Sequence, residues 1–199
     1  MSETLATLSG LVMIVVVVFY FMQVAGGSST PNPATWFIWL VVMAMNVVTY
    51  YFVSNGNFWP VLTPSIITLG ILLIFIYSFN KGRLGKLGWM EWMTLGLAVV
   101  VGIFWQVTKD GTASNLMMQI ILLIAFVPTV IGVISGKLKE KPLSWITAVI
   151  SYVLLIASIL CNDDWTWVQL AYPFFNGIVG NGSVALATQA RRKKAPTED

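Results

Sequence analysis

Histidine is absent from this chain of 199 residues, and cysteine occurs once, as Cys161. Zinc sites of the Cys/His type, Ser-His-Asp triads, haem bound through histidine and disulfides are therefore excluded within a single chain. No pair of nucleophile and base and no set of metal ligands can be assembled inside the apolar segments. We accordingly expect no catalytic residue, no metal site and no cofactor, and we do not expect an enzyme.

Charge is scarce as well. Charged residues make up 10% of the chain, against roughly 25% in an ordinary soluble domain. Hydrophobic residues make up 57%, and the mean hydropathy is +0.82. From Thr4 to Asn80 there is no formal charge, and a helix needs about 20 apolar residues to cross a bilayer core. This composition argues against a water-soluble protein and leaves room for three spans in that one run.

Gly, Pro, Asn and charged residues divide the chain into seven apolar segments joined by short connectors, which favours antiparallel neighbouring helices. The first segment lacks a basic leader, so we interpret it as a retained span rather than a signal peptide. We therefore predict an all-α integral membrane protein with seven transmembrane helices, at residues 5–24, 34–53, 59–79, 88–107, 116–134, 143–160 and 165–188.

The basic residues predict the orientation. With seven spans, one side of the membrane receives ten of the eleven bases, namely Lys81, Arg83, Lys86, Lys137, Lys139, Lys141, Arg191, Arg192, Lys193 and Lys194. The positive-inside rule assigns that side to the cytoplasm, so we expect an outside N-terminus and a cytoplasmic C-terminus. Because the bases lie beside apolar segments, the expected partner is membrane lipid and not nucleic acid. We take a bacterial inner membrane as the location.

Rare residues suggest an internal repeat. A shift of 109 residues pairs Pro33 with Pro142, Trp36 with Trp145 and Pro64 with Pro173 without a gap. Overall identity at this shift is weak, and coincidence among apolar helices is the alternative. If the repeat is real, the fourth helix is unpaired and gives both copies of three helices the same orientation. We predict two parallel triple-helix bundles, residues 1–80 and 111–190, joined by a linker helix in 81–110 and followed by a basic and then acidic tail, 191–199.

This arrangement resembles the SWEET and PQ-loop superfamily of three-plus-one-plus-three membrane proteins. The most similar stretches are VPTVI at 127–131 and SGKLKEKPLSW at 135–145. They match the superfamily's proline in the first helix of a triplet, its basic turn and the small-residue start of the next helix. Thr129 stands where the namesake glutamine would be, and Phe19 and Tyr20 replace the Pro-Gln pair of the first repeat, so no characterised subgroup matches. The resemblance implies a path between the triplets, lined by aromatic and amide side chains.

The second predicted helix carries one face of large side chains at helical spacing: Trp36, Trp39, Met43, Asn46 and Tyr50. Packing in a bundle explains the apolar members without a function. Asn46 is different, because an amide deep in hydrocarbon needs a partner on another helix or in a polar cavity. Asn115 and Gln119, at the start of the fifth helix, could form an outer vestibule.

The last predicted helix has a polar stripe of Gln169, Tyr172, Asn176, Gly180 and Ser183. Asn176 is the first candidate for a solute contact, since SWEET-like proteins place a substrate-facing amide in the third helix of a triplet. The position that matches it in the first repeat is Ile67, so the site is expected to be asymmetric. For Asn181, a helix contact is as good an interpretation as pore lining.

The predicted substrate-binding residues are Asn176, Asn46, Trp36, Trp145, Tyr152, Tyr172, Asn181 and Tyr50. The predicted hinges are Pro128, Pro64 and Pro173, because a proline removes a backbone hydrogen bond and bends a helix. A static kink that aids packing is the alternative for all three.

Apart from Glu91 at a helix end, no ionisable acid or base lies within the predicted spans, whereas proton-driven transporters usually carry one. We therefore expect SWEET-like facilitative, uncoupled transport of a small neutral polar solute such as a sugar or vitamin precursor. The alternative is a non-transporting seven-helix receptor, chaperone or structural membrane subunit that uses the same stripes for partner contacts. A continuous polar lining would favour transport, and a sealed apolar centre with bonded Asn side chains would favour the alternative. A homo-oligomer remains open.

Overall fold

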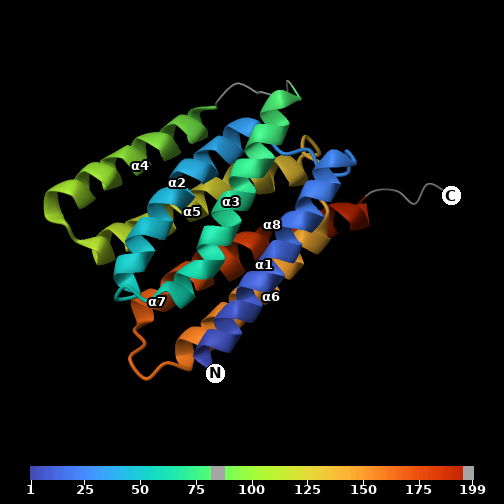
Figure 1. Cartoon of the computed structure of the whole chain (residues 1–199). Coiled ribbons are helices and arrows are strands. Elements are labelled where there is room, and N and C mark those ends of the chain that lie inside the picture. Colours follow the sequence, from blue (N-terminus) through green and yellow to red (C-terminus); the bar gives the residue numbers. More distant parts are fainter. Residues whose placement is uncertain (82–87, 195–199) are drawn as a thin grey trace.

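The computed structural model describes residues 1–81 and 88–194, and these residues form helices and no strand (Figure 1). The helices are α1 (Ser2–Ala25), α2 (Pro33–Val53), α3 (Phe58–Asn80), α4 (Trp89–Thr108), α5 (Gly111–Ile134) and α6 (Pro142–Leu160). A seventh helical segment runs without a break through α7 (Trp167–Ala171), the π-helix η1 (Tyr172–Gly180) and α8 (Asn181–Lys194). Over these residues, the prediction of an all-helical protein with seven helices is confirmed.

Some of the residues named in the predictions lie outside the part of the chain that the structure describes. The loop bases Arg83 and Lys86 and the acidic end of the tail, 195–199, lie outside the described residues. The basic start of that tail is helical, because α8 continues to Lys194.

Five helices are long and apolar enough to cross a membrane: α1, α2, α3, α5 and α6. In α4 the apolar part, Trp92–Thr108, is shorter. Large apolar side chains on the outer surface include Trp89, Ile103 and Val107, which are 72%, 59% and 77% exposed. Such a surface would be costly in water and suits contact with lipid, so the fold is compatible with a multi-pass membrane protein.

The helix starts follow the 109-residue offset. Helices α1, α2 and α3 begin at residues 2, 33 and 58, and α5, α6 and α7 begin at residues 111, 142 and 167. Pro33 and Pro142 each occupy the first turn, where proline's missing N–H costs nothing. After α1 and α5 the chain turns through Gly27 and Gly136, with φ of 72° and 82°, a conformation that favours glycine.

Helix packing follows the same offset. Helix α3 packs against both α1 and α2, while η1 and α8 pack against both α5 and α6. Across the middle of the molecule, α1 packs against α6 and α2 packs against α5. Helix α4 lies on the outside, against α2 and α5 (Figure 1).

The bundle has two ends, here named the N-terminal end, where α1 begins, and the basic end, which carries Lys137, Lys139 and Lys141. At the N-terminal end, Ser2 donates to the backbone oxygen of Ser158 at 2.9 Å, and the Tyr50 hydroxyl donates to the backbone oxygen of Gln169 at 2.7 Å. At the basic end, the backbone N–H of Thr30 donates to the Lys139 oxygen at 2.8 Å. The Lys139 N–H donates in return to the Thr30 hydroxyl at 2.9 Å. Residues 30 and 139 are themselves offset by 109, so the two equivalent loops meet each other.

Candidate solute-binding cavity

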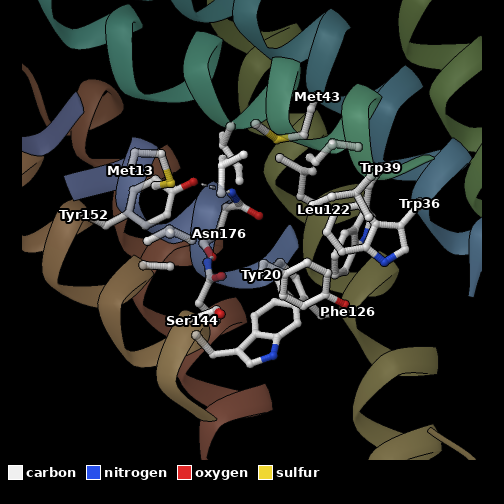
Figure 2. A pocket seen from close by; sticks show the side chains of 18 residues that line it. Met13, Tyr20, Trp36, Trp39, Met43, Leu122, Phe126, Ser144, Tyr152 and Asn176 are labelled. Atoms are coloured by element: carbon white, nitrogen blue, oxygen red, sulfur yellow. Dashed lines mark hydrogen bonds between the residues drawn. The ribbon is translucent and has the colours of Figure 1, made fainter. Parts of the chain in front are cut away.

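A cavity of about 60 Å³ lies at the centre of the bundle, between α1–α3 on one side and α5, α6, η1 and α8 on the other (Figure 2). A single water needs about 10–15 Å³, so several waters or one compact solute would fit. Its wall comes from all of these elements and not from α4. Hydrogen bonds at both ends of the bundle, from Ser2 to Ser158 and between Thr30 and Lys139, tie the two sets of helices together above and below the cavity.

Aromatic rings form one wall of this cavity: Tyr20, Trp36, Trp39, Phe126 and Trp145. They contact one another in a continuous cluster, with Tyr20 stacked on Trp36 at 4.9 Å and edge-on to Trp145 at 5.7 Å between ring centroids. The Trp39 indole N–H donates to the backbone oxygen of Ala125 on α5 at 3.2 Å. Four of these rings are seen together on one side of Figure 2. We call this group the aromatic cluster.

The opposite wall holds the polar groups. Asn176 donates from Nδ2 to the Tyr152 hydroxyl at 3.4 Å, and that hydroxyl is 2.8 Å from the hydroxyl of Tyr172. Asn181 donates to the backbone oxygen of Asn176 at 2.9 Å. In Figure 2, Asn176 and Tyr152 lie across the cavity from the aromatic cluster. These amides project from η1 and the start of α8, and π-helical turns are frequent at functional sites.

Ser144 adds an unusual feature to the lining. Its side chain lies in the cavity wall at 2% exposure, and its hydroxyl has no hydrogen-bond partner among the described residues. A buried hydroxyl without a partner is destabilising. A molecule in the cavity would supply the partner.

The structure brings most of the predicted site residues together. Trp36, Trp145, Tyr152, Asn176 and Asn181 line the cavity. Tyr50 and Tyr172 are not among the lining residues. Their rings are 5.1 Å apart, and the hydroxyl of Tyr172 is 2.8 Å from that of the lining residue Tyr152.

Asn46 lies apart from the cavity, in a buried amide cluster with Asn115 and Gln119. Its Oδ1 accepts from Asn115 Nδ2 at 3.1 Å and from Gln119 Nε2 at 2.9 Å. All three residues are at most 2% exposed. Asn115 and Gln119 therefore bond to α2 and do not face a vestibule. The Oδ1 of Asn46 thus has partners on α5, while its Nδ2 has none among the described residues. Asn46 is not among the residues that line the cavity.

The predicted hinge prolines lie inside helical segments. Pro64 is within α3, Pro128 within α5 and Pro173 within η1. Pro128 is two residues from Phe126 in the aromatic cluster, and Pro173 is three residues from Asn176. Two of the three are thus close in sequence to the cavity wall, and their bending role stays a prediction.

Glu140 is the functional candidate that sequence reasoning missed. It lies in the loop before α6, and its carboxylate accepts from the Tyr20 hydroxyl at 2.8 Å and from the Trp145 indole N–H at 3.3 Å. Burial raises the pKa of the Glu140 carboxyl to about 7, although these hydrogen bonds oppose the rise. Because lysines flank Glu140 on both sides, the sequence alone indicates an ordinary charged loop residue. Its position five residues before Trp145 was the available signal.

Fold and site together describe an all-helical protein, with five helices suited to a membrane, built around a small internal cavity. Comparison of the chain with protein-family models, with curated proteins and with solved structures finds no match.

Proposed function

We propose that this chain is a seven-helix membrane protein whose central cavity binds a small solute and passes it across the membrane by facilitated, uncoupled transport. The observation that carries the proposal is the central cavity between the two sets of three helices, with the unpartnered Ser144 hydroxyl in its wall. A solute bound at this central position would be released toward one end of the bundle or the other if the two sets of helices moved relative to each other.

The repeated architecture supports this proposal. The helix starts share one offset, and the contacts of α1 with α3 and α6 correspond to those of α5 with α8 and α2. We interpret residues 1–80 and 111–190 as two parallel triple-helix bundles, with α4 as their linker. Parallel repeats about an axis along the membrane normal are the architecture of SWEET transporters, so the resemblance to the SWEET and PQ-loop superfamily agrees with this interpretation.

The lining favours a solute with an apolar or aromatic body and one polar group. Rings and aliphatic side chains make up most of the wall, and its polar groups are few: Ser144, Asn176, Asn181 and the hydroxyls of Tyr20 and Tyr152. A sugar offers hydroxyls on all sides and would leave many of them unpaired here. No Asp, Glu, Lys or Arg is among the lining residues, which supports transport without proton coupling.

Asn176→Leu tests the proposal directly. The substitution keeps the branched shape of the side chain and removes the amide from the cavity, so it should lower solute flux by at least about tenfold with little loss of stability. A thermal-shift screen against sugars, amino acids, nucleosides and vitamins would identify the stabilising solute. Flux of that solute into proteoliposomes would then be compared between wild type and variant.

Two outcomes of that comparison would contradict the proposal. Unchanged flux with Asn176→Leu would show that the solute does not pass through the cavity. Uphill accumulation driven by an imposed pH gradient would show coupling to protons.

A non-transporting receptor or structural subunit is the second candidate. The amide cluster of Asn46, Asn115 and Gln119 favours it, because one of the predicted solute contacts is used instead to join α2 to α5. The mainly apolar centre of the molecule favours it too. In that case the cavity would bind a ligand that shifts the conformation without crossing, and specific binding without flux would be observed.

We place the basic end in the cytoplasm and the N-terminus outside, following the distribution of bases. Lipid is then the partner of the exposed apolar surface, and a bacterial inner membrane remains the working location.

A further inference from the structure

The charge of the solute can be inferred from the groups around the cavity. Glu140 is bonded to two residues of the cavity wall, Tyr20 and Trp145, so its carboxylate is one hydrogen bond away from the cavity. The groups that bear on this carboxyl are three uncharged side chains, those of Tyr20, Trp145 and Ser29. A half-buried carboxylate normally has a cationic partner, because burial without one is costly.

The neighbouring cations are not among the groups that act on the Glu140 carboxyl. Lys137, Lys139 and Lys141 are exposed in the same loop. The guanidinium of Arg191 donates to the backbone oxygen of Leu138 at 2.8 Å and to that of Val133 at 3.5 Å. No counter-charge for Glu140 is thus found among the described residues, although Lys139 and Lys141 are its neighbours in the sequence.

The aromatic cluster supplies the second requirement for a cation. The faces of Trp and Tyr rings attract ammonium groups, and cages of such rings are the usual means of binding quaternary ammonium ligands. Here five rings from α1, α2, α5 and α6 surround one side of the cavity, with Glu140 immediately behind two of them.

A third feature lies at the N-terminal end of the bundle. A pocket of about 380 Å³ there is lined by the carboxylates Asp163 and Asp164 together with Ser54, Asn55, Asn57, Asn162, Gln169 and Pro60, and no base is among these residues. A recess with one sign of charge raises the local concentration of the opposite ion. Solutes that approach from this end would therefore be enriched in cations.

We propose that the solute of the central cavity is a small organic cation, an amine or quaternary ammonium on a compact apolar body, held against the aromatic cluster with Glu140 as its counter-charge. This inference rests on the proposed function, since the solute must enter that cavity. It replaces the expectation of a neutral solute. That expectation considered only the acids within the helices and did not consider Glu140, which lies in the loop before α6.

The test uses a matched pair of probes on the purified full-length protein: choline, and dimethylbutanol, in which carbon replaces the nitrogen of choline. Binding is followed by tryptophan fluorescence and by thermal shift. Choline should bind saturably and at least about tenfold more tightly than its uncharged analogue, because ring faces and carboxylate both favour the charge. Glu140→Gln should remove most of that preference.

Two further variants make the test decisive. Glu3→Gln removes an equal charge from an exposed site at the opposite end and should leave the preference unchanged. Trp36→Leu removes a ring from the cluster and should weaken choline more than dimethylbutanol, which keeps the test valid if Glu140→Gln does not fold.

Equal binding of the two probes would overturn the cationic preference while leaving a solute-binding cavity intact. Binding of neither probe would also overturn it, and so would an unchanged preference in both Glu140→Gln and Trp36→Leu. In each of these cases the flux comparison with Asn176→Leu still decides the proposed transport function separately.

Discussion

Two asparagines of the same chain illustrate how neighbours decide the role of a residue. Asn46 and Asn176 are both buried, and both were expected to contact solute. Asn46 accepts two hydrogen bonds from amides of α5, whereas Asn176 makes one long bond to a tyrosine and lines the cavity. The first therefore contributes to assembly, and the second is available to a ligand.

Asn46→Leu should consequently destabilise the protein. It removes the two hydrogen bonds that Asn46 Oδ1 accepts from Asn115 and Gln119, at a cost of about 2 kcal/mol in the free energy of unfolding, although both amides keep a second acceptor in Thr49 or Asn115. Thermal unfolding in detergent would measure the effect, with Asn176→Leu as the matched control of the same chemistry. Equal stability losses in the two variants would contradict the distinction between them.

The raised pKa of Glu140 predicts that the stability of the folded protein depends on pH. Because its pKa is raised from 4.5 to about 7 in the folded protein, the folded state binds its proton more tightly than the unfolded state does. Its contribution to stability is thus full below pH 4.5 and is lost as the pH rises to about 7. Unfolding temperatures of wild type and Glu140→Gln, measured across that range, should differ in slope, with the shallower fall in the variant. Parallel curves would contradict this.

The sequence predicted the position of a residue best where that residue type is rare in a membrane interior. Trp36, Trp145 and Asn176 could be identified because few explanations exist for large aromatics and amides at such positions. Glu140 could not, since a glutamate between lysines is ordinary in a loop, and only the fold shows that it turns toward Tyr20. The partners of Asn46 depended on the packing of α2 against α5, which no local pattern specifies.

At the scale of elements, the six helices of the two sets were predicted within six residues of their observed ends, because proline, asparagine and glycine mark most of the boundaries. The π-helix was not predicted. Pro173 signalled a bend, but the wider turns of η1 depend on close packing: Gly177 lies against Tyr152 and Gly180 against Phe126. Such contacts between helices cannot be predicted from the spacing of residues within one helix.

Gly177→Ala tests that packing. A Cβ at this position would overlap the Cβ and ring of Tyr152, so the substitution should lower the free energy of unfolding by about 1–3 kcal/mol and displace Tyr152 from Asn176. Gly182→Ala is the matched control in the adjoining helix, since a Cβ there meets nothing within 4 Å. The control should be neutral or slightly stabilising. A tolerated Gly177→Ala would show that η1 does not need close approach.

At the scale of the whole molecule, the orientation in the membrane is the main prediction. Cys161 is the single cysteine and is exposed just after α6, at the N-terminal end. A membrane-impermeant maleimide should therefore label it in intact cells. In a Cys161→Ser background, Ser135→Cys at the basic end should react only after permeabilisation. The reverse pattern would mean that the orientation inferred from the bases is wrong.

Helix α8 joins two features that have so far been treated separately. Its first residue, Asn181, lines the cavity, and near its other end Arg191 holds the backbone of the loop before α6. Helix η1, directly before it, bonds five residues back along the chain instead of four. If that register tightened to the α form, α8 would rotate as a rigid rod, turning Asn181 out of the cavity wall and drawing Arg191 off its loop in one movement. A change of η1 from the π form to the α form would therefore couple a change at the cavity to the far surface of the protein.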